Sequence, residues 1–132
     1  MRTNTVDKRK YAIFLRKAEQ YYHGMQAAVL AEEWHQALLS AIHCAISSSD
    51  AVTTWYLGEK STSQSHEDVV HLLQRTQATG AKEKVRQIQD ILSIKALVEY
   101  DAEELSAERA RVLVKQTERV YQWAQTILPK ER

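Results

Sequence analysis

Apolar residues recur every three or four positions over most of this chain, the spacing that places them on one face of an α-helix. Long stretches with this pattern cover residues 6–22, 34–57, 82–100 and 107–128, and a shorter one covers residues 65–76. The first stretch extends to residue 33 if a helix passes through Gly24. The hydrophobic pattern therefore predicts an all-α protein.

Few helix-breaking residues interrupt these stretches. The chain of 132 residues has three glycines and one proline, which leaves little turn chemistry for a sheet of several hairpins. The clearest breaks fall at residues 58–64, 79–80 and 101–106. Short connections between long helices predict an antiparallel four-helix bundle with the short helix beside it. We expect a single domain over residues 1–132, with its core between about residues 6 and 128.

A line of polar side chains runs along the second predicted helix, within the segment AIHCAISSSDAVTTW at residues 41–55. At about 100° per residue, these side chains project to the same side of the helix. Most of the remaining circumference is apolar, which is typical of a central helix. Because a buried polar group without a partner costs on the order of 1–3 kcal/mol, the line should face a polar groove. The polar line consists of His43, Ser47, Asp50 and Thr54.

Polar residues where other predicted helices begin or end are candidates to meet this line. We expect Asp50 to orient a histidine and Lys95 to offer positive charge to an anionic ligand such as a phosphate. The same polar line also fits a buried structural network that fixes helix register, and spacing leaves both interpretations open. The predicted polar pocket consists of His43, Ser47, Asp50, His66, Lys95 and Tyr100.

Several other kinds of site lack their sequence signatures. No His-x-x-x-His pair for metal ligation, Gly-x-Ser-x-Gly nucleophile elbow or phosphate-binding glycine loop occurs in the chain. We therefore expect neither a metal site nor a cofactor. The catalytic residues, if there are any, stay unknown at this stage.

Charge and cysteine content limit which binding partners and which cellular compartment we expect for the protein. Lysine and arginine total 18 against 17 aspartates and glutamates, so net charge requires neither nucleic acid nor an anionic membrane. Arg16 and Lys17 interrupt the first apolar run, and no segment reaches the roughly 20 apolar residues of a membrane span. Cys44 is the single cysteine, which fits a reducing compartment. We expect a cytoplasmic protein with no membrane partner.

Three segments in this order resemble the HEPN superfamily (higher eukaryotes and prokaryotes nucleotide-binding domain): AIHCAISSSDA, GEKSTSQSHEDVVHLLQ and ILSIKALVEYDAEELSAERARVLVKQTERVYQWA. The resemblance covers about residues 10–128 and is closest to bacterial HEPN-like proteins. It implies an antiparallel four-helix bundle with a short extra helix, commonly paired as a homodimer. It also implies roles in RNA cleavage, nucleotide binding, or toxin–antitoxin and defence systems.

The sequence departs from the superfamily at one motif. Its ribonuclease members resemble one another in an Arg-x4–6-His motif late in the bundle, whereas no histidine follows His71 here. Arg16 and His23 have that spacing but lie near the start of the chain, and we interpret the match as coincidence. Enzymatic activity is therefore uncertain, and the sequence favours none.

Three function classes follow. The leading one is a HEPN-like protein, non-catalytic or catalytically diverged, that binds a nucleotide, RNA or partner protein through the polar groove. The second is a metal-independent ribonuclease, a toxin or defence component, in which His43 or His66 acts with Lys95. The third is a structural adaptor or antitoxin-like subunit.

A homodimer is expected as well. The second predicted helix is apolar around most of its circumference, and a small bundle has few helices to cover it. Candidate contacts are Trp34, Trp55 and Tyr56.

Overall fold

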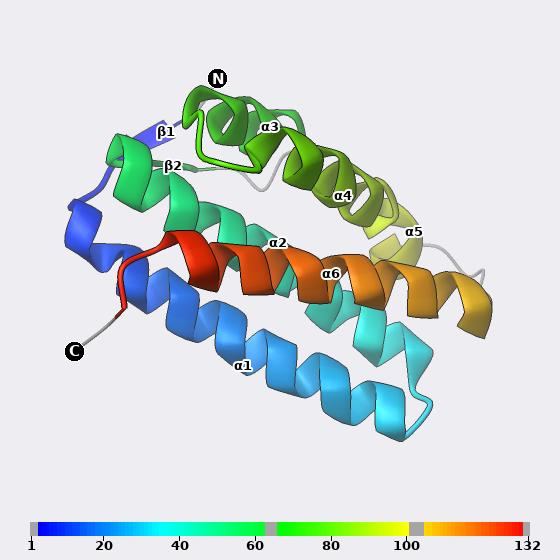
Figure 1. Cartoon of the computed structure of the whole chain (residues 1–132). Coiled ribbons are helices and arrows are strands. Elements are labelled where there is room, and N and C mark those ends of the chain that lie inside the picture. The colour runs from blue at the N-terminus through cyan, green and yellow to red at the C-terminus, as the bar shows by residue number, and fades with distance from the viewer. Residues whose placement is uncertain (1–2, 63–65, 101–104, 131–132) are drawn as a thin grey trace.

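The computed structural model describes residues 3–62, 66–100 and 105–130, most of which are helical (Figure 1). A 3-10 turn, η1 (Lys8–Lys10), precedes the first helix. The all-α class predicted from the hydrophobic period is confirmed. The α-helices are α1 (Tyr11–Leu30), α2 (Trp34–Leu57), α3 (His66–Arg75), α4 (Ala81–Ser93), α5 (Lys95–Tyr100) and α6 (Ala107–Ile127).

In the first half of the chain, α2 matches its predicted bounds, whereas α1 begins five residues later than the predicted start at residue 6, after the 3-10 turn η1. α1 passes through Gly24. Gly58 ends α2 in a left-handed conformation (φ 68°), with its amide donating to the Thr54 carbonyl at 2.9 Å. The predicted breaks at residues 58–64 and 101–106 fall partly outside the described residues.

The helix predicted over residues 82–100 is divided at Ile94 into α4 and α5. In one continuous helix, Lys95 would follow Ile88 and Leu92 on the buried face, at spacings of seven and three. The division keeps Ile94 and Val98 in the core while the Lys95 side chain stays partly exposed. A binary pattern read over the whole stretch does not show this change of direction.

A small sheet was not predicted from the sequence. β1 (Thr3–Thr5) and β2 (Glu59–Ser61) pair antiparallel, with Thr3 opposite Ser61 and Thr5 opposite Glu59. The Val6 amide donates to the Gly58 carbonyl at 2.8 Å and continues this pairing to the end of α2. The start of the chain is thereby held against the segment that follows α2.

α2 is the central element of the fold. It contacts α1, α3, α4, α5 and α6, and most of its residues between 37 and 54 are buried. α1 and α2 run antiparallel, because Ala18 clusters with Cys44 whereas Met25 clusters with Ala37. α6 runs antiparallel to α1 and packs against both helices of this pair (Figure 1), and the Tyr11 hydroxyl donates to the Pro129 carbonyl at 2.9 Å.

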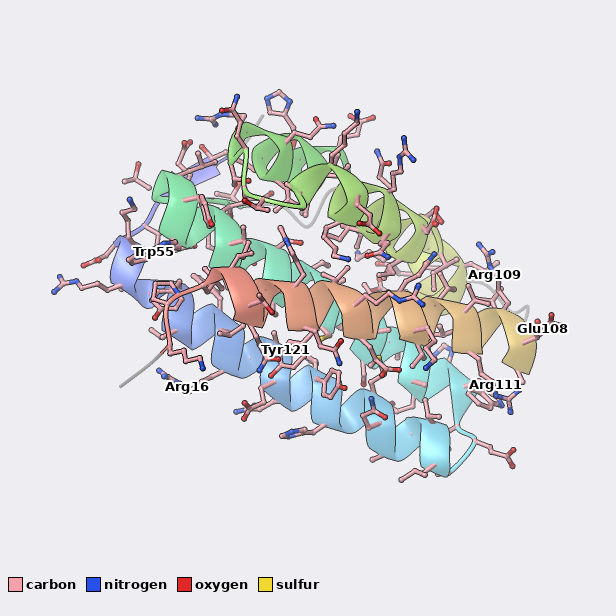
Figure 2. All side chains as sticks on the ribbon, in the orientation of Figure 1. Arg16, Trp55, Glu108, Arg109, Arg111 and Tyr121 are labelled. Carbon is pink, nitrogen blue, oxygen red and sulfur yellow. The ribbon has the colours of Figure 1, made fainter. Side chains whose placement is uncertain are left out.

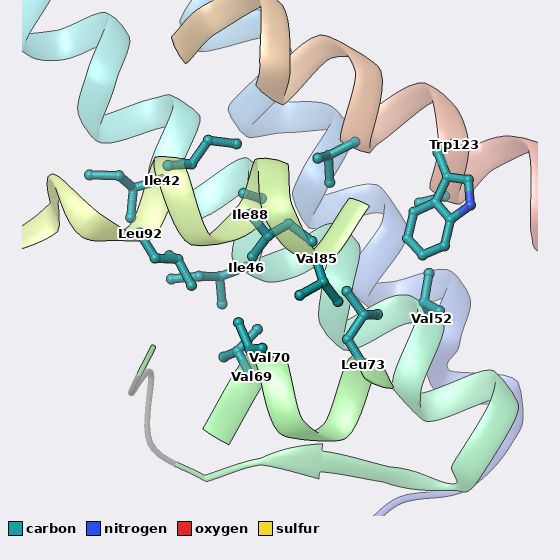
Figure 3. Close-up of a cluster of buried hydrophobic side chains, with 14 of the residues drawn as sticks. Ile42, Ile46, Val52, Val69, Val70, Leu73, Val85, Ile88, Leu92 and Trp123 are labelled. Carbon is teal, nitrogen blue, oxygen red and sulfur yellow. The ribbon is translucent and has the colours of Figure 1, made fainter. Parts of the chain in front are cut away.

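The largest apolar cluster lies where α2 meets α3 and α4 (Figure 3). Ile42 and Ile46 of α2 face the α4 side chains Ile88 and Leu92 across this region. The α3 residues Val69, Val70 and Leu73 close it from below in that view. The short helix α3 is therefore part of the core and supports one side of α2.

The helices of the same chain cover α2. This covering weakens the argument for a homodimer, which was that too few helices would be present to bury α2. Trp34, Trp55 and Tyr56 are partly buried and pack against the core of the same chain. The apolar circumference of α2 therefore does not by itself require a second subunit, and the homodimer stays a prediction. None of the helices in the described ranges is both long enough and apolar enough to span a membrane.

Candidate functional site

The polar line on α2 lies along the side of the helix that borders α1 and β2. Thr54 is fully buried and Ser47 nearly so, while His43 and Asp50 are partly exposed. α1 supplies Tyr21, whose ring stacks on that of His43 with centroids 5.2 Å apart and an interplanar angle of 28°. The line thus forms one wall of a seam between α2 and its neighbours.

Asp50 is the acid of this seam, and only part of its side chain is exposed. Burial raises the pKa of Asp50 to about 7, and the positive charges of Lys60 and Lys17 act in the opposite direction. Within residues 3–62, 66–100 and 105–130, its carboxyl group forms no hydrogen bond or ion pair. The Thr54 hydroxyl, one turn further along α2, is buried and also lacks a partner in these ranges.

Two lysines converge on one aromatic ring beside Asp50. The Lys17 ammonium lies 5.6 Å from the centroid of the Phe14 ring, and the Lys60 ammonium lies 5.5 Å from the same centroid. Phe14 and Lys17 belong to α1, whereas Lys60 belongs to β2. Each contact has the distance of a cation–π interaction, which holds an ammonium group in place without neutralising its charge.

A third lysine extends this arrangement toward η1. The Lys8 ammonium lies 5.6 Å from the Trp55 ring centroid, and the Lys8 side chain passes close to Gly58. Trp55 is at the end of the molecule occupied by η1, the end opposite to that of Arg111 (Figure 2). We call Lys8, Lys17 and Lys60, with Phe14 and Trp55, the lysine edge.

The acids next to Lys8 and Lys60 in the chain have arginine partners. Asp7 pairs with Arg9 at 2.8 Å, and Glu59 pairs with Arg75 at 3.0 Å. In the described ranges, none of the three lysines forms an ion pair. The lysine edge is therefore a local excess of positive charge in a chain whose formal net charge is only +1.

The remaining predicted site residues lie elsewhere or cannot be placed. Lys95 forms an ion pair with Glu99 at 3.4 Å, and Tyr100 is 82% exposed at the end of α5. α5 lies toward the opposite end of the molecule from β2 (Figure 1), so neither residue is a neighbour of Lys60. The side chain of His66 is outside the described part of the chain.

The structure thus places Asp50 within the electrostatic reach of Lys17 and Lys60, which the sequence analysis did not select, and places His43 against Tyr21 of α1. Lys17 lies on the polar side of an ordinary amphipathic helix, and Lys60 lies in a predicted loop, so neither stands out by its spacing. One sequence signal was available, because three lysines lie within a few residues of Phe14 or Trp55, but only the fold shows which pairs meet.

Cys44, a possible nucleophile by residue type, is poorly suited to that role. It is fully buried between α1 and α6, and burial raises the pKa of its thiol to about 12. The thiolate is the reactive form of cysteine, so this side chain is unreactive near neutral pH in the folded protein.

In the portion of the chain that the structure describes, no three His, Cys, Asp or Glu side chains gather in a way that could hold a metal ion. Comparison with known proteins found no matching family model and no matching curated protein.

Proposed function

We propose that this chain is a HEPN-like helical protein that binds a phosphate-bearing ligand, a nucleotide or RNA, at the lysine edge and the polar line of α2. The observation that carries the proposal is the convergence of Lys17 and Lys60, the two lysines whose charges act on Asp50, on the Phe14 ring. Both ammonium groups lie within 5.6 Å of one ring centroid and have no ion-pair partner in the described ranges.

The chemistry of the lysine edge fits an anionic, partly aromatic ligand. The Lys60 ammonium donates one hydrogen bond to the Ser61 carbonyl at 3.0 Å, and a lysine ammonium has three donors. Ammonium groups outside ion pairs bind phosphate oxygens through charge-assisted hydrogen bonds. Aromatic side chains interleaved with lysines are typical of surfaces that bind single-stranded nucleic acid, where bases stack and phosphates contact cations. The Tyr21–His43 stack continues this polar and aromatic surface along the seam.

The arrangement of the helices supports the HEPN-like part of the proposal. α1, α2 and α6 are the long helices, with 20, 24 and 21 residues, and the shorter helices α3, α4 and α5 pack beside α2, which is compatible with the bundle and extra helix that the resemblance implies. The histidine and aspartate of the segment AIHCAISSSDA lie on the side of α2 that faces the lysine edge.

Binding of a fluorescent RNA oligonucleotide and of a fluorescent nucleotide, measured by polarisation at two salt concentrations, tests the proposal. Lys17→Ala and Lys60→Ala should each weaken binding by about tenfold, the value of one charge-assisted contact. Each variant should also reduce the salt dependence of RNA binding.

The matched control is Lys115→Ala, an exposed lysine on α6, which packs against a different side of α2. Affinity should be unchanged in this variant. Equal losses in all three variants would indicate non-specific attraction, and unchanged affinity in a Lys17→Ala, Lys60→Ala double variant would refute the proposed site.

Asp50 favours a second candidate function, RNA cleavage at the same seam. An acid with a pKa of about 7 is suited to accept the proton of a 2′-hydroxyl near neutral pH. As that oxygen forms its bond to phosphorus, the bond from phosphorus to the 5′-oxygen breaks and the 5′-oxygen takes a proton from water, while Lys17 and Lys60 would stabilise the negative charge of the phosphorane. Cleavage of a labelled RNA that is lost in Asp50→Asn while RNA binding persists would support this function, and no cleavage by the unmodified protein would exclude it.

A further inference from the structure

We infer that Tyr21 of α1, which stacks on His43 of α2, recognises the base of a nucleoside phosphate whose phosphate group the lysine edge binds. This inference rests on the proposed function, because it concerns the same site. It adds a specificity, since the ligand is recognised by its base as well as by its charge, and a sugar phosphate without a base binds less tightly.

The Tyr21 ring is an accessible aromatic surface with a fixed orientation. The residue is 39% exposed, and its ring stacks on that of His43 with centroids 5.2 Å apart. Because His43 belongs to the central helix α2, this stack holds the tyrosine ring against the body of the protein. A base that stacks on a ring held in this way gains the contact without the entropic cost of ordering the side chain.

The position of Tyr21 along α1 suits a ligand that also reaches the lysine edge. Phe14, Lys17 and Tyr21 follow one another at spacings of three and four, so their side chains lie on the same side of α1. The ammonium groups of Lys17 and Lys60 lie 5.6 and 5.5 Å from the Phe14 ring centroid. Tyr21 is seven positions after Phe14, which is about 10 Å along the helix axis. A nucleoside monophosphate has a similar length from its phosphate oxygens to the far edge of its base, so one nucleotide can contact both the lysines and the tyrosine.

Gly24 leaves space beside the Tyr21 ring. It lies three positions after Tyr21 in the ordinary helical conformation, so the backbone does not require glycine there, although glycine weakens a helix. A Cβ atom at this position would lie 3.4 Å from the Ser40 Oγ atom, which places Gly24 in the same seam between α1 and α2. Long side chains on a helix lean toward its N-terminus, so one at position 24 would extend over the turn that carries Tyr21.

Two probes that differ only by the base test the inference, adenosine 5′-monophosphate (AMP) and ribose 5-phosphate, both titrated into the full chain by calorimetry. AMP should bind about tenfold more tightly, the effect of one stack between a base and an aromatic ring. Tyr21→Ala should lower the affinity for AMP to that for ribose 5-phosphate and leave the affinity for ribose 5-phosphate unchanged. Tyr21→Phe keeps the ring and should bind both probes like the unmodified protein.

Two further variants check that the effect belongs to this ring. Gly24→Gln keeps Tyr21 but places a long side chain beside it, and should lower the affinity for AMP alone. Tyr100→Ala is the matched control at another exposed tyrosine, on α5, and should change neither affinity. Circular dichroism checks that each variant keeps the helical content of the unmodified protein.

A direct measurement needs no substitution. In proton NMR spectra of the unmodified protein, AMP should shift the Tyr21 ring protons upfield through the ring current of the stacked base, and ribose 5-phosphate should not. A short oligoadenylate that binds more tightly than AMP would identify RNA as the source of the base, and equal affinities would identify a free nucleotide. The loss in Tyr21→Ala is expected with either ligand.

The outcomes separate this inference from the proposed function. Equal affinities of the unmodified protein for AMP and ribose 5-phosphate, an unchanged affinity for AMP in Tyr21→Ala, or no binding of either probe would overturn the inference. The proposed site would still stand if Lys17→Ala and Lys60→Ala weakened the binding of the RNA oligonucleotide. RNA binding that did not depend on these lysines, together with no binding of either probe, would overturn both.

Discussion

Replacing Gly80 with alanine should destabilise the protein, whereas the same replacement at Gly24 should stabilise it. Gly80 precedes α4 with a φ of 84°, in the left-handed region that residues with a Cβ atom adopt at a cost of about 1 kcal/mol. Its Cβ would also lie 3.0 Å from the Trp123 Nε1 atom and 3.4 Å from Cδ1.

The second part of the cost comes from the Trp123 indole. Its Nε1–H donates to the Thr79 carbonyl at 2.8 Å, so the ring cannot move away from a new methyl group without weakening this hydrogen bond. Losing the bond costs on the order of 1 kcal/mol. Together with the backbone term, Gly80→Ala should lower the free energy of unfolding by about 2–3 kcal/mol.

Gly24 is the matched control, since α1 continues through it in the ordinary helical conformation. A Cβ there would lie 3.4 Å from the Ser40 Oγ atom, an ordinary contact. Alanine is favoured over glycine inside a helix by roughly 0.8–1 kcal/mol, so Gly24→Ala should raise stability by a similar amount.

Urea unfolding followed by circular dichroism measures both changes, as shifts of the midpoint with little change of the m-value. In a Trp123→Phe background, the Gly80→Ala cost should fall to the backbone value of about 1 kcal/mol, because the indole nitrogen is gone. A Gly80→Ala protein as stable as the original, or a cost independent of Trp123, would refute this account of the α3–α4 connection.

Three further predictions concern single side chains. The folded-state pKa of Asp50, about 7, exceeds its unfolded value of about 3.9. The free energy of unfolding should therefore fall by on the order of 2–4 kcal/mol as pH rises from about 4 to about 7. At pH 8, the urea midpoint of Asp50→Asn should be higher than that of the unmodified protein, and it should depend less on pH. Tyr11→Phe should cost about 1 kcal/mol by removing the bond to Pro129, while Tyr100→Phe, at an exposed position, should cost nothing measurable in the same assay. Cys44 should react with a thiol reagent at pH 8 only as fast as the protein unfolds, and rapid labelling of the native protein would show that the thiol is accessible.

The hydrophobic period was sufficient to predict the all-α class and the bounds of α2. The hydrophobic period was sufficient for α2 because other helices surround α2, so that its apolar positions are the buried ones. It was insufficient at Ile94, where α4 ends and α5 begins so that Lys95 stays out of the core, a packing effect that depends on the contacts of α4 and α5 with α2. It also missed β1 and β2, since three-residue strands are too short to show alternation.

Of the candidate site, only the residues on α2 could be predicted from the sequence, whereas the lysines on α1 and β2 could not. The polar line of α2 is a periodic feature of one helix, and spacing alone reveals His43, Ser47 and Asp50 as neighbours. Lys17 and Lys60 are 43 positions apart in the sequence, and nothing local distinguishes them from other surface lysines. Their shared contact with Phe14 follows from the antiparallel packing of α1 on α2 and from the pairing of β2 with β1.

The β1–β2 pairing limits how long Lys60, which β2 carries, stays next to Lys17 before the strands separate. Two strands of three residues are marginal by themselves, so this pairing should open at a much lower free energy than α2, whose amides are buried. Amide hydrogens in the pairing should therefore exchange with solvent long before those of α2. A ligand that links Lys60 to Lys17 would hold β2 in place, and would slow exchange in residues 3–5 of the opposite strand without touching them.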